Sequence, residues 1–257
     1  LFRFCYFCNM KISHYLDATY LKTAIQLGIT EKENLEKIVA LTKEAISYDY
    51  KLVMIRSNYI TTVKKIVSIS GSKVLIGTVI DFPCGNASLK QKIQEAENAI
   101  KLGADELDFV VNYNAFKKGN IDVVTEEVTR CIALCLSNQK IAKFIIEAAA
   151  LSNEEIIVIS QLVKQIVLEN FGEENAKNVF VKSSTGFFKT ERGIPNGATF
   201  ENIMLISKNA KPLKIKAAGG VRDYETALKM ISLGVDRIGT SSSKEIINKE
   251  QYSNQSY

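Results

Sequence analysis

A lysine closes a short apolar run of this chain, at a position where it could do carbonyl chemistry. Residues 179–185 read VFVKSST, so Lys182 ends a run that belongs in a buried strand. Burying an ammonium without a partner costs several kcal/mol. Either Lys182 faces solvent at the strand end, or its burial serves to change the properties of its amine. Burial favours the neutral amine, and only a neutral amine can attack a carbonyl carbon.

Two further charged residues could share a pocket with Lys182. Side chains alternate between the two faces of a strand, so Lys216 and Asp108 can both point to the inner face of their predicted strands. A second ammonium beside Lys182 would lower its pKa by repulsion, and Asp108 could then move protons. A fall from about 10.4 to about 7 corresponds to about 4.6 kcal/mol, which burial and one close ammonium can supply together. The alternative, left open by the spacing alone, is a static network of ion pairs at the strand ends.

Apolar strands alternate with amphipathic helices along the chain. The predicted strands are His14–Ala18, Leu52–Arg56, Val74–Asp81, Glu106–Asn112, Ala142–Ala148, Val179–Ser183, Lys214–Ala218 and Asp236–Gly239. The predicted helices between them are Glu31–Tyr48, Thr61–Ser70, Ser88–Leu102, Ile121–Leu136, Asn153–Glu169, Phe200–Ala210 and Tyr224–Leu233. Four capping residues support the helix starts, namely Thr30, Ser88, Ser152 and Thr199.

Repeated strand and helix units in about 250 residues predict one α/β domain, a (β/α)8 (TIM) barrel. No linker rich in proline, glycine or serine divides the chain, so we expect one domain over residues 1–257, with 1–12 as a leader and 248–257 as a tail outside the core. An open, doubly wound sheet is the alternative. Its usual dinucleotide signal, GxGxxG after the first strand, is replaced here by YLDAT at residues 15–19.

Two glycine-rich turns follow the last two predicted strands. Residues 217–222 read AAGGVR, and residues 238–242 read IGTSS. Backbone N–H groups in such turns, with a helix N-terminus and the hydroxyls of Ser241 and Ser242, can form an anion cradle. The loops after strands seven and eight are the usual phosphate position on this fold. The turns therefore predict a phosphate-binding site.

Composition and charge narrow the class of protein. The chain is 46% hydrophobic and 24% charged, as soluble globular domains are. Its net charge of +5 is spread through predicted helices, which favours an acidic small molecule and does not indicate nucleic acid binding. We expect no membrane segment, because no stretch reaches the roughly 20 apolar residues of a span. Five cysteines without a disulfide pattern favour a reducing compartment, so we expect a cytoplasmic protein.

Metal-binding residues are scarce in this sequence. Cys5 and Cys8 form a CxxC, but no second pair lies at metal-ligand spacing, so two unpaired thiols are the simpler interpretation. His14 is the single histidine, and we expect it to pack or to form a hydrogen bond at the first strand. A metal-dependent mechanism is not indicated, since too few zinc ligands are present.

An ordered set of motifs resembles the deoxyribose-phosphate aldolase family, which consists of Schiff-base (class I) aldolases on a (β/α)8 barrel. The resemblance runs from about Leu16 to Ser243. Its motifs are LDATYLK (16–22), IGTVIDFPCG (76–85), GADELDFVVN (103–112), FIIEAAAL (144–151), VKSSTGF (181–187), NGAT (196–199), IKAAGGVR (215–222) and GVDRIGTSS (234–242). No single motif is specific, but the ordered set is.

The resemblance implies a lyase reaction that needs no metal and no cofactor. In that reaction 2-deoxy-D-ribose 5-phosphate is cleaved reversibly into D-glyceraldehyde 3-phosphate and acetaldehyde. The resemblance assigns the imine to Lys182, and it assigns pKa lowering and proton transfer to Lys216. It assigns to Asp108 a proton relay through water. An iminium is an electron sink, which makes loss of the C–C bonding pair feasible.

The resemblance also suggests roles for residues around these three. Asp17 would hydrogen-bond a substrate hydroxyl, or else cap the first loop. Tyr257 would carry protons into the pocket, or else belong to a solvated tail. The residues that match the phosphate region are Gly186, Gly219, Gly220, Gly239, Ser241 and Ser242.

Three departures from the family pattern bear on substrate preference more than on reaction class. Ala18 stands where the family often has histidine. VMIRS at 53–57 replaces the usual V-C-V-x-P of the second strand. The sequence after STGF is longer than the common glycine turn, so Lys189 or Arg192 could add phosphate contacts.

Two other functions and one assembly state stay open from the sequence. The first rival is another Schiff-base barrel aldolase, of the transaldolase or fructose-bisphosphate type. The second is a catalytically silent barrel that binds a sugar phosphate as a sensor or scaffold. A homo-oligomer, either a dimer or a tetramer, is compatible with outer helices that bury a neighbour without a visible change of pattern.

Overall fold

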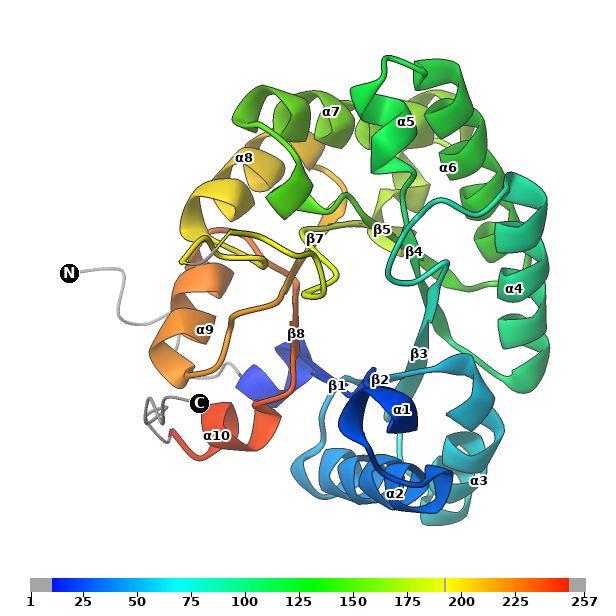
Figure 1. Cartoon of the computed structure of the whole chain (residues 1–257), viewed down its shortest axis with the longest axis vertical. Helices are drawn as coiled ribbons and strands as arrows, with labels where there is room; N and C mark the ends of the chain where they lie inside the picture. Colours follow the sequence, from blue (N-terminus) through cyan, green and yellow to red (C-terminus); the bar gives the residue numbers. More distant parts are fainter. Residues whose placement is uncertain (1–10, 192, 250–257) are drawn as a thin grey trace.

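Parallel strands close into a barrel in chain order (Figure 1). The computed structural model describes residues 11–191 and 193–249. Within them the strands are β1 (Leu16–Thr19), β2 (Leu52–Ile55), β3 (Leu75–Ile80), β4 (Glu106–Val110), β5 (Ile141–Ile145), β6 (Val179–Lys182), β7 (Lys214–Ala218) and β8 (Arg237–Thr240). Strand β8 pairs in parallel with β1, which closes the sheet. The predicted (β/α)8 barrel is thereby confirmed.

The helices form a ring around this barrel (Figure 1). Their bounds are α1 (Ala24–Leu27), α2 (Glu31–Tyr48), α3 (Ile60–Ser70), α4 (Leu89–Leu102), α5 (Tyr113–Lys117), α6 (Ile121–Ser137), α7 (Asn153–Asn170), α8 (Phe200–Ala210), α9 (Tyr224–Ser232) and α10 (Ser243–Ile247). Short 3-10 turns are η1 (Ile12–Tyr15), η2 (Ser57–Tyr59), η3 (Ala148–Ala150) and η4 (Glu173–Asn178). Each predicted cap accepts a hydrogen bond from the first turn of its helix, and these caps are Thr30, Ser88, Ser152 and Thr199.

The first strand begins later than the sequence predicts. His14 lies in η1, and its exposed ring Nε2 is 3.0 Å from Asp49 Oδ2. The histidine therefore has the expected hydrogen-bonding role, but outside the strand. Ile12, which falls in the predicted leader, is buried in the main core. Cys5, Cys8 and Tyr257 lie outside the described residues, so their predicted roles stay predictions.

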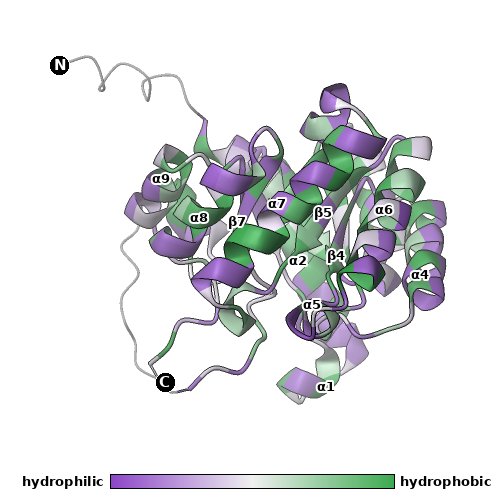
Figure 2. Cartoon of the chain, turned by 90° about the horizontal axis from the view of Figure 1, so that it is seen from above, coloured by the Kyte–Doolittle hydropathy of each residue, from purple (hydrophilic) through white to green (hydrophobic). Residues whose placement is uncertain are grey.

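The main core lies between the barrel and the helices. Fully buried side chains such as Ile38 of α2, Val163 of α7 and Ile206 of α8 contribute to it. Figure 2 shows purple and green residues alternating around the turns of the helices, as amphipathic helices require. Between residues 11 and 249, with 192 set aside, no helix is both long and apolar enough to cross a membrane.

The barrel interior is apolar on one side. Leu52 and Met54 of β2 pack there with Val79 of β3 and with Leu21. A Cβ atom at Gly77 would lie 2.5 Å from Met54 Cε, so the glycine makes room for that side chain. The other side of the interior, from β4 round to β1, is filled by charged residues.

Candidate active site

Lys182, Lys216 and Asp108 meet inside the barrel. They extend from β6, β7 and β4, and all three side chains are buried. Asp108 Oδ2 accepts hydrogen bonds from Lys182 Nζ at 2.8 Å and from Lys216 Nζ at 2.9 Å. The strand register aligns Lys182 with Lys216, so neighbouring parallel strands hold the two ammonium groups on one face. The structure thus brings together the three residues that sequence alternation suggested.

Asp17 belongs to the same network. Its Oδ2 lies 2.6 Å from Lys216 Nζ, and its Oδ1 accepts a hydrogen bond from Arg237 Nε at 2.6 Å. The carboxylate is fully buried, and it does not line the cavity that opens beside Lys182. Asp17 therefore forms an ion pair with Lys216 inside the barrel, and its carboxylate caps no loop among the described residues.

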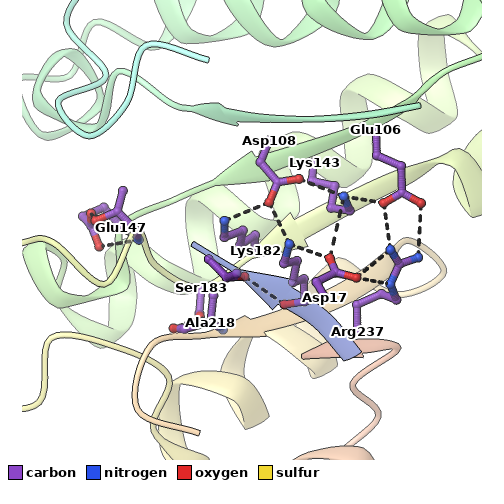
Figure 3. A network of polar contacts seen from close by, with 12 residues as sticks. Asp17, Glu106, Asp108, Lys143, Glu147, Lys182, Ser183, Ala218 and Arg237 are labelled. Carbon is purple, nitrogen blue, oxygen red and sulfur yellow. Dashed lines mark hydrogen bonds and ion pairs between the residues drawn. The ribbon is translucent and has the colours of Figure 1, made fainter. Parts of the chain in front are cut away.

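The network contains three further buried charged residues that were not predicted as site residues from the sequence, namely Glu106, Lys143 and Arg237 (Figure 3). Lys143 of β5 donates a hydrogen bond of 2.8 Å to Asp108 Oδ1 and pairs with Glu106. Arg237 of β8 binds Glu106 through both Nη atoms, at 3.2 and 2.9 Å. Their signal was a charged residue inside an apolar strand, which is costly unless it is paired. The pairing itself crosses strands and depends on the stagger of the barrel.

The pKa of Lys182 is lowered to about 8. Burial is the largest cause, and the ammonium groups of Lys216 and Lys143 add repulsion, while Asp108 acts in the opposite direction. With a pKa near 8, roughly a tenth of Lys182 is neutral at pH 7, against less than a thousandth for an ordinary lysine. Lys182 is therefore equipped to act as a nucleophile.

The surrounding groups keep their charges. Burial raises the pKa of Asp108, but Lys143, Lys182 and Lys216 outweigh it and hold that pKa well below its ordinary value. Burial lowers the pKa of Lys143, but Asp108, Glu106 and Asp17 outweigh it and raise that pKa. Asp108 stays a carboxylate and Lys143 an ammonium across the physiological range.

The ion pairs of the network favour Lys182 as the lysine that loses its proton. Lys182 pairs with one carboxylate, that of Asp108, whereas Lys216 pairs with two and Lys143 with three. Three carboxylates of the network face four cationic side chains, and with Lys182 neutral the remaining three cations balance them. The carboxylates are Asp17, Glu106 and Asp108, and the three other cations are Lys143, Lys216 and Arg237. Neutral Lys182 thus leaves no buried carboxylate without a partner.

A cavity of about 640 Å³ opens beside Lys182. Lys182 and Thr185 of the β6 end line it, as do Lys22 and Lys37. Of the predicted phosphate residues, those in its wall are Gly186, Gly219, Gly220, Gly239 and Ser241.

Three predicted phosphate contacts are not placed in this wall. Ser242 is buried and does not line the cavity. Its backbone N–H donates a hydrogen bond to Thr240 Oγ1 at 2.9 Å. Lys189 does not line the cavity either, and Arg192 is outside the described residues. Two cations of the wall, Lys22 after β1 and Lys37 on α2, were not predicted as phosphate contacts from the sequence.

The glycines are required by close backbone approach. Gly219 has φ of +82°, and a Cβ atom there would lie 2.8 Å from Gly197 Cα and 3.4 Å from Gly186 Cα. The N–H of Ala198 donates to Gly219 O at 2.9 Å, which ties the loop after β6 to the loop after β7. A Cβ at Gly239 would lie 3.1 Å from Lys216 Cε, so Gly239 leaves space for the lysine.

Sequence comparison identifies the family from nearly the whole chain. The profile described as DeoC/LacD family aldolase matches residues 15–241. This chain belongs to the DeoC/LacD aldolase family. A relative in the family, the deoxyribose-phosphate aldolase of Clostridium kluyveri, is 39% identical over 218 residues, which cover 84% of this chain and 91% of the relative. The deoxyribose-phosphate aldolase of Caldicellulosiruptor saccharolyticus is 36% identical over 242 residues, which cover 93% and 98%.

Solved structures of aldolases have the same fold. A protein described as QR15, an aldolase, superposes with a TM-score of 0.74 at 33% identity, covering 92% of this chain and 94% of its own. The tetrameric deoxyribose phosphate aldolase of Aeropyrum pernix superposes with a TM-score of 0.73 at 25% identity, covering 92% and 89%. The family resemblance seen in the motifs is confirmed by these comparisons.

Proposed function

We propose that this chain is a deoxyribose-phosphate aldolase. It cleaves 2-deoxy-D-ribose 5-phosphate reversibly into D-glyceraldehyde 3-phosphate and acetaldehyde through an imine on Lys182. Family membership and the names of the relatives support the reaction class. The observation that carries the mechanism is Lys182 itself, a buried amine with a pKa of about 8 in the wall of a cavity.

Imine formation begins with attack of the neutral Lys182 amine on the aldehyde carbon, C1. The carbinolamine then loses water, for which a proton must reach its hydroxyl. Asp108 contacts both Lys182 Nζ and Lys216 Nζ, so protons can pass between these groups without a large rearrangement. Asp108 keeps a negative charge beside the new iminium.

Carbon–carbon cleavage follows from the iminium. The C3 hydroxyl loses its proton and becomes the aldehyde of D-glyceraldehyde 3-phosphate, while the C2–C3 bonding pair moves into the iminium. The resulting enamine on Lys182 takes a proton at C2. Water then hydrolyses the imine, which releases acetaldehyde and restores the amine.

The phosphate would lie among the glycine-rich turns after β6, β7 and β8. Gly186, Gly219 and Gly220 have positive φ values and expose backbone close to the cavity. Backbone N–H groups in such turns bind anions. Lys22 and Lys37 in the same wall add positive charge. Lys182 and these turns line the same cavity, which supports a sugar phosphate as the substrate.

The activity should rise with pH through about pH 8. Lys182 must be neutral to attack, and its pKa is lowered to about 8, so kcat/KM should increase about tenfold per pH unit below this value and level off above it. The measurement is kcat/KM for unphosphorylated 2-deoxyribose, since a phosphate would add its own titration near pH 6. A profile that is flat between about pH 6 and about pH 8 would contradict the assignment of Lys182.

Gly219→Ala should impair phosphate recognition. The added Cβ would press on Gly197 and would strain a backbone with φ of +82°. We expect kcat/KM to fall at least about tenfold for 2-deoxyribose 5-phosphate and less than about threefold for 2-deoxyribose.

Gly71→Ala is the matched control for Gly219→Ala. Gly71 also has a positive φ, but a Cβ there meets nothing within 4 Å. It lies at the end of α3, away from the cavity wall. An equal loss on both substrates in Gly219→Ala would place the phosphate elsewhere.

Three finer expectations extend the proposal. The names of the relatives favour the deoxyribose phosphate over the longer ketoses of transaldolase or fructose-bisphosphate aldolase. A homo-oligomer of two or four copies is supported by the tetrameric relative from Aeropyrum pernix. A cytoplasmic location stays a prediction from composition.

A further inference from the structure

Glu147 is a buried carboxylate beside the cavity that the steps above do not use. It follows β5, is only 1% exposed, and adopts φ of +54°, which non-glycine residues rarely do. Figure 3 shows it on the opposite side of Lys182 from Arg237, apart from the main network. Burial raises its pKa, against hydrogen bonds from Thr185. A buried carboxylate on a strained backbone beside the reactive amine calls for a functional explanation.

The side chain of Glu147 is committed to one partner. Its carboxylate accepts hydrogen bonds from both the backbone N–H of Thr185, at 3.2 Å, and the Thr185 hydroxyl. Backbone bonds fix the two loops to each other, because the N–H of Ala148 donates to Ser183 O at 2.8 Å. Thr185 is three residues after Lys182 and lines the cavity next to Gly186.

The hydroxyl of Thr185 is left with one lone pair that accepts no hydrogen bond from the described residues. A hydroxyl has one proton to donate and two lone pairs to accept with. The proton is donated to Glu147, and one lone pair accepts the backbone N–H of Phe187 at 3.0 Å. The second lone pair accepts no hydrogen bond from the described residues, and Thr185 lines the cavity. Thr185 therefore offers the cavity an acceptor and no donor, which matches a ligand hydroxyl or N–H.

We propose that Glu147 is a positioning residue that makes Thr185 a dedicated acceptor for one substrate hydroxyl. This inference rests on the proposed function. In 2-deoxyribose 5-phosphate the two free hydroxyls of the open chain are on C3 and C4. The C3 hydroxyl must lie near the iminium, beside Asp108 and Lys216. In the sequence Thr185 lies between Lys182 and Gly186 of the glycine cradle, and all three line the cavity. We therefore assign as its partner the C4 hydroxyl, next to the phosphate-bearing carbon.

The pair then selects the electrophilic aldehyde in the synthetic direction. The C4 hydroxyl is the C2 hydroxyl of D-glyceraldehyde 3-phosphate. 3-Oxopropyl phosphate is the same aldehyde without that hydroxyl. A site built to hydrogen-bond a hydroxyl rejects the analogue that lacks it, because its buried acceptor is then left unpaired.

The test is the ratio of kcat/KM for D-glyceraldehyde 3-phosphate to kcat/KM for 3-oxopropyl phosphate, with acetaldehyde as the donor. Thr185→Val should lower this ratio about tenfold, and Thr185→Ser should keep it within about threefold of the wild type. Glu147→Ala should lower it too, because the Thr185 hydroxyl then loses the acceptor that fixes its orientation. A merely structural role for either residue would lower both rates together and leave the ratio unchanged.

Ser184→Ala supplies the matched control. Ser184 is the buried hydroxyl residue next to Thr185, it has no hydrogen-bond partner in the described part of the chain, and it does not line the cavity. Its ratio should equal that of the wild type. An unchanged ratio in Thr185→Val would overturn the inference.

Failure of the proposed function has a different outcome. In that case the wild-type protein would form no borohydride-reducible adduct with acetaldehyde and would condense neither aldehyde. If instead the wild type forms the adduct and condenses both aldehydes, but Thr185→Val leaves the ratio unchanged, only the role of Glu147 and Thr185 is contradicted.

Discussion

Lys182→Met is expected to lower kcat/KM for 2-deoxyribose 5-phosphate by at least about 10⁴-fold, because the variant has no amine to form the imine. The barrel should nevertheless fold at least as well as the wild type. With methionine in place of Lys182, three carboxylates still face three cations in the network, and the desolvation of a fourth cation is avoided. The measurements are steady-state kinetics and the thermal unfolding midpoint.

Lys143→Met is the matched control for this prediction. Lys143 is equally buried, but it lies between Asp108 and Glu106. Its loss leaves those carboxylates short of a cation, so the variant should lose about 3 kcal/mol of stability. If Lys182→Met retained substantial turnover, or unfolded as readily as Lys143→Met, the distinction between a nucleophile and a structural cation would be wrong.

Lys216→Met is expected to slow the reaction chiefly by raising the pKa of Lys182. Removing Lys216 takes away a repelling ammonium, and it also leaves the charge of Asp108 less compensated. Both changes favour protonated Lys182, so its pKa should rise above about 8. At pH 7 the fraction of neutral Lys182 should fall by about 10- to 100-fold.

The pH dependence distinguishes this effect from lost proton transfer. As the pH rises above 8, the gap between Lys216→Met and the wild type should narrow, because the amine becomes neutral in both. Any loss that persists at high pH measures the part of Lys216 in proton transfer. A uniform loss with the rising limb still centred near pH 8 would show that Lys216 does not tune Lys182.

The sequence was sufficient for the barrel and for the three central residues, for physical reasons. Strand alternation put Lys182, Lys216 and Asp108 on inner faces, and parallel strands of a closed barrel direct such faces to one interior. The helix starts were predictable because capping is local, as the four hydroxyl caps confirm.

The remainder of the site depends on contacts between distant residues. Arg237 binds Asp17 across 220 positions of sequence, and that pairing follows from barrel closure and stagger. Glu147 has a left-handed backbone conformation, which the sequence does not predict for a glutamate. Ser242 differs from Ser241 by one position, and the local turn decides which of them reaches the wall.

Borohydride reduction of the protein in the presence of 2-deoxyribose 5-phosphate tests the central claim most directly. Reduction makes an imine permanent, so intact mass and peptide mapping locate the lysine that formed it. The account predicts a single adduct on Lys182, with none in Lys182→Met. An adduct confined to another lysine, or no adduct while calorimetry shows the sugar phosphate bound, would contradict it and leave a silent sugar phosphate-binding barrel as the better description.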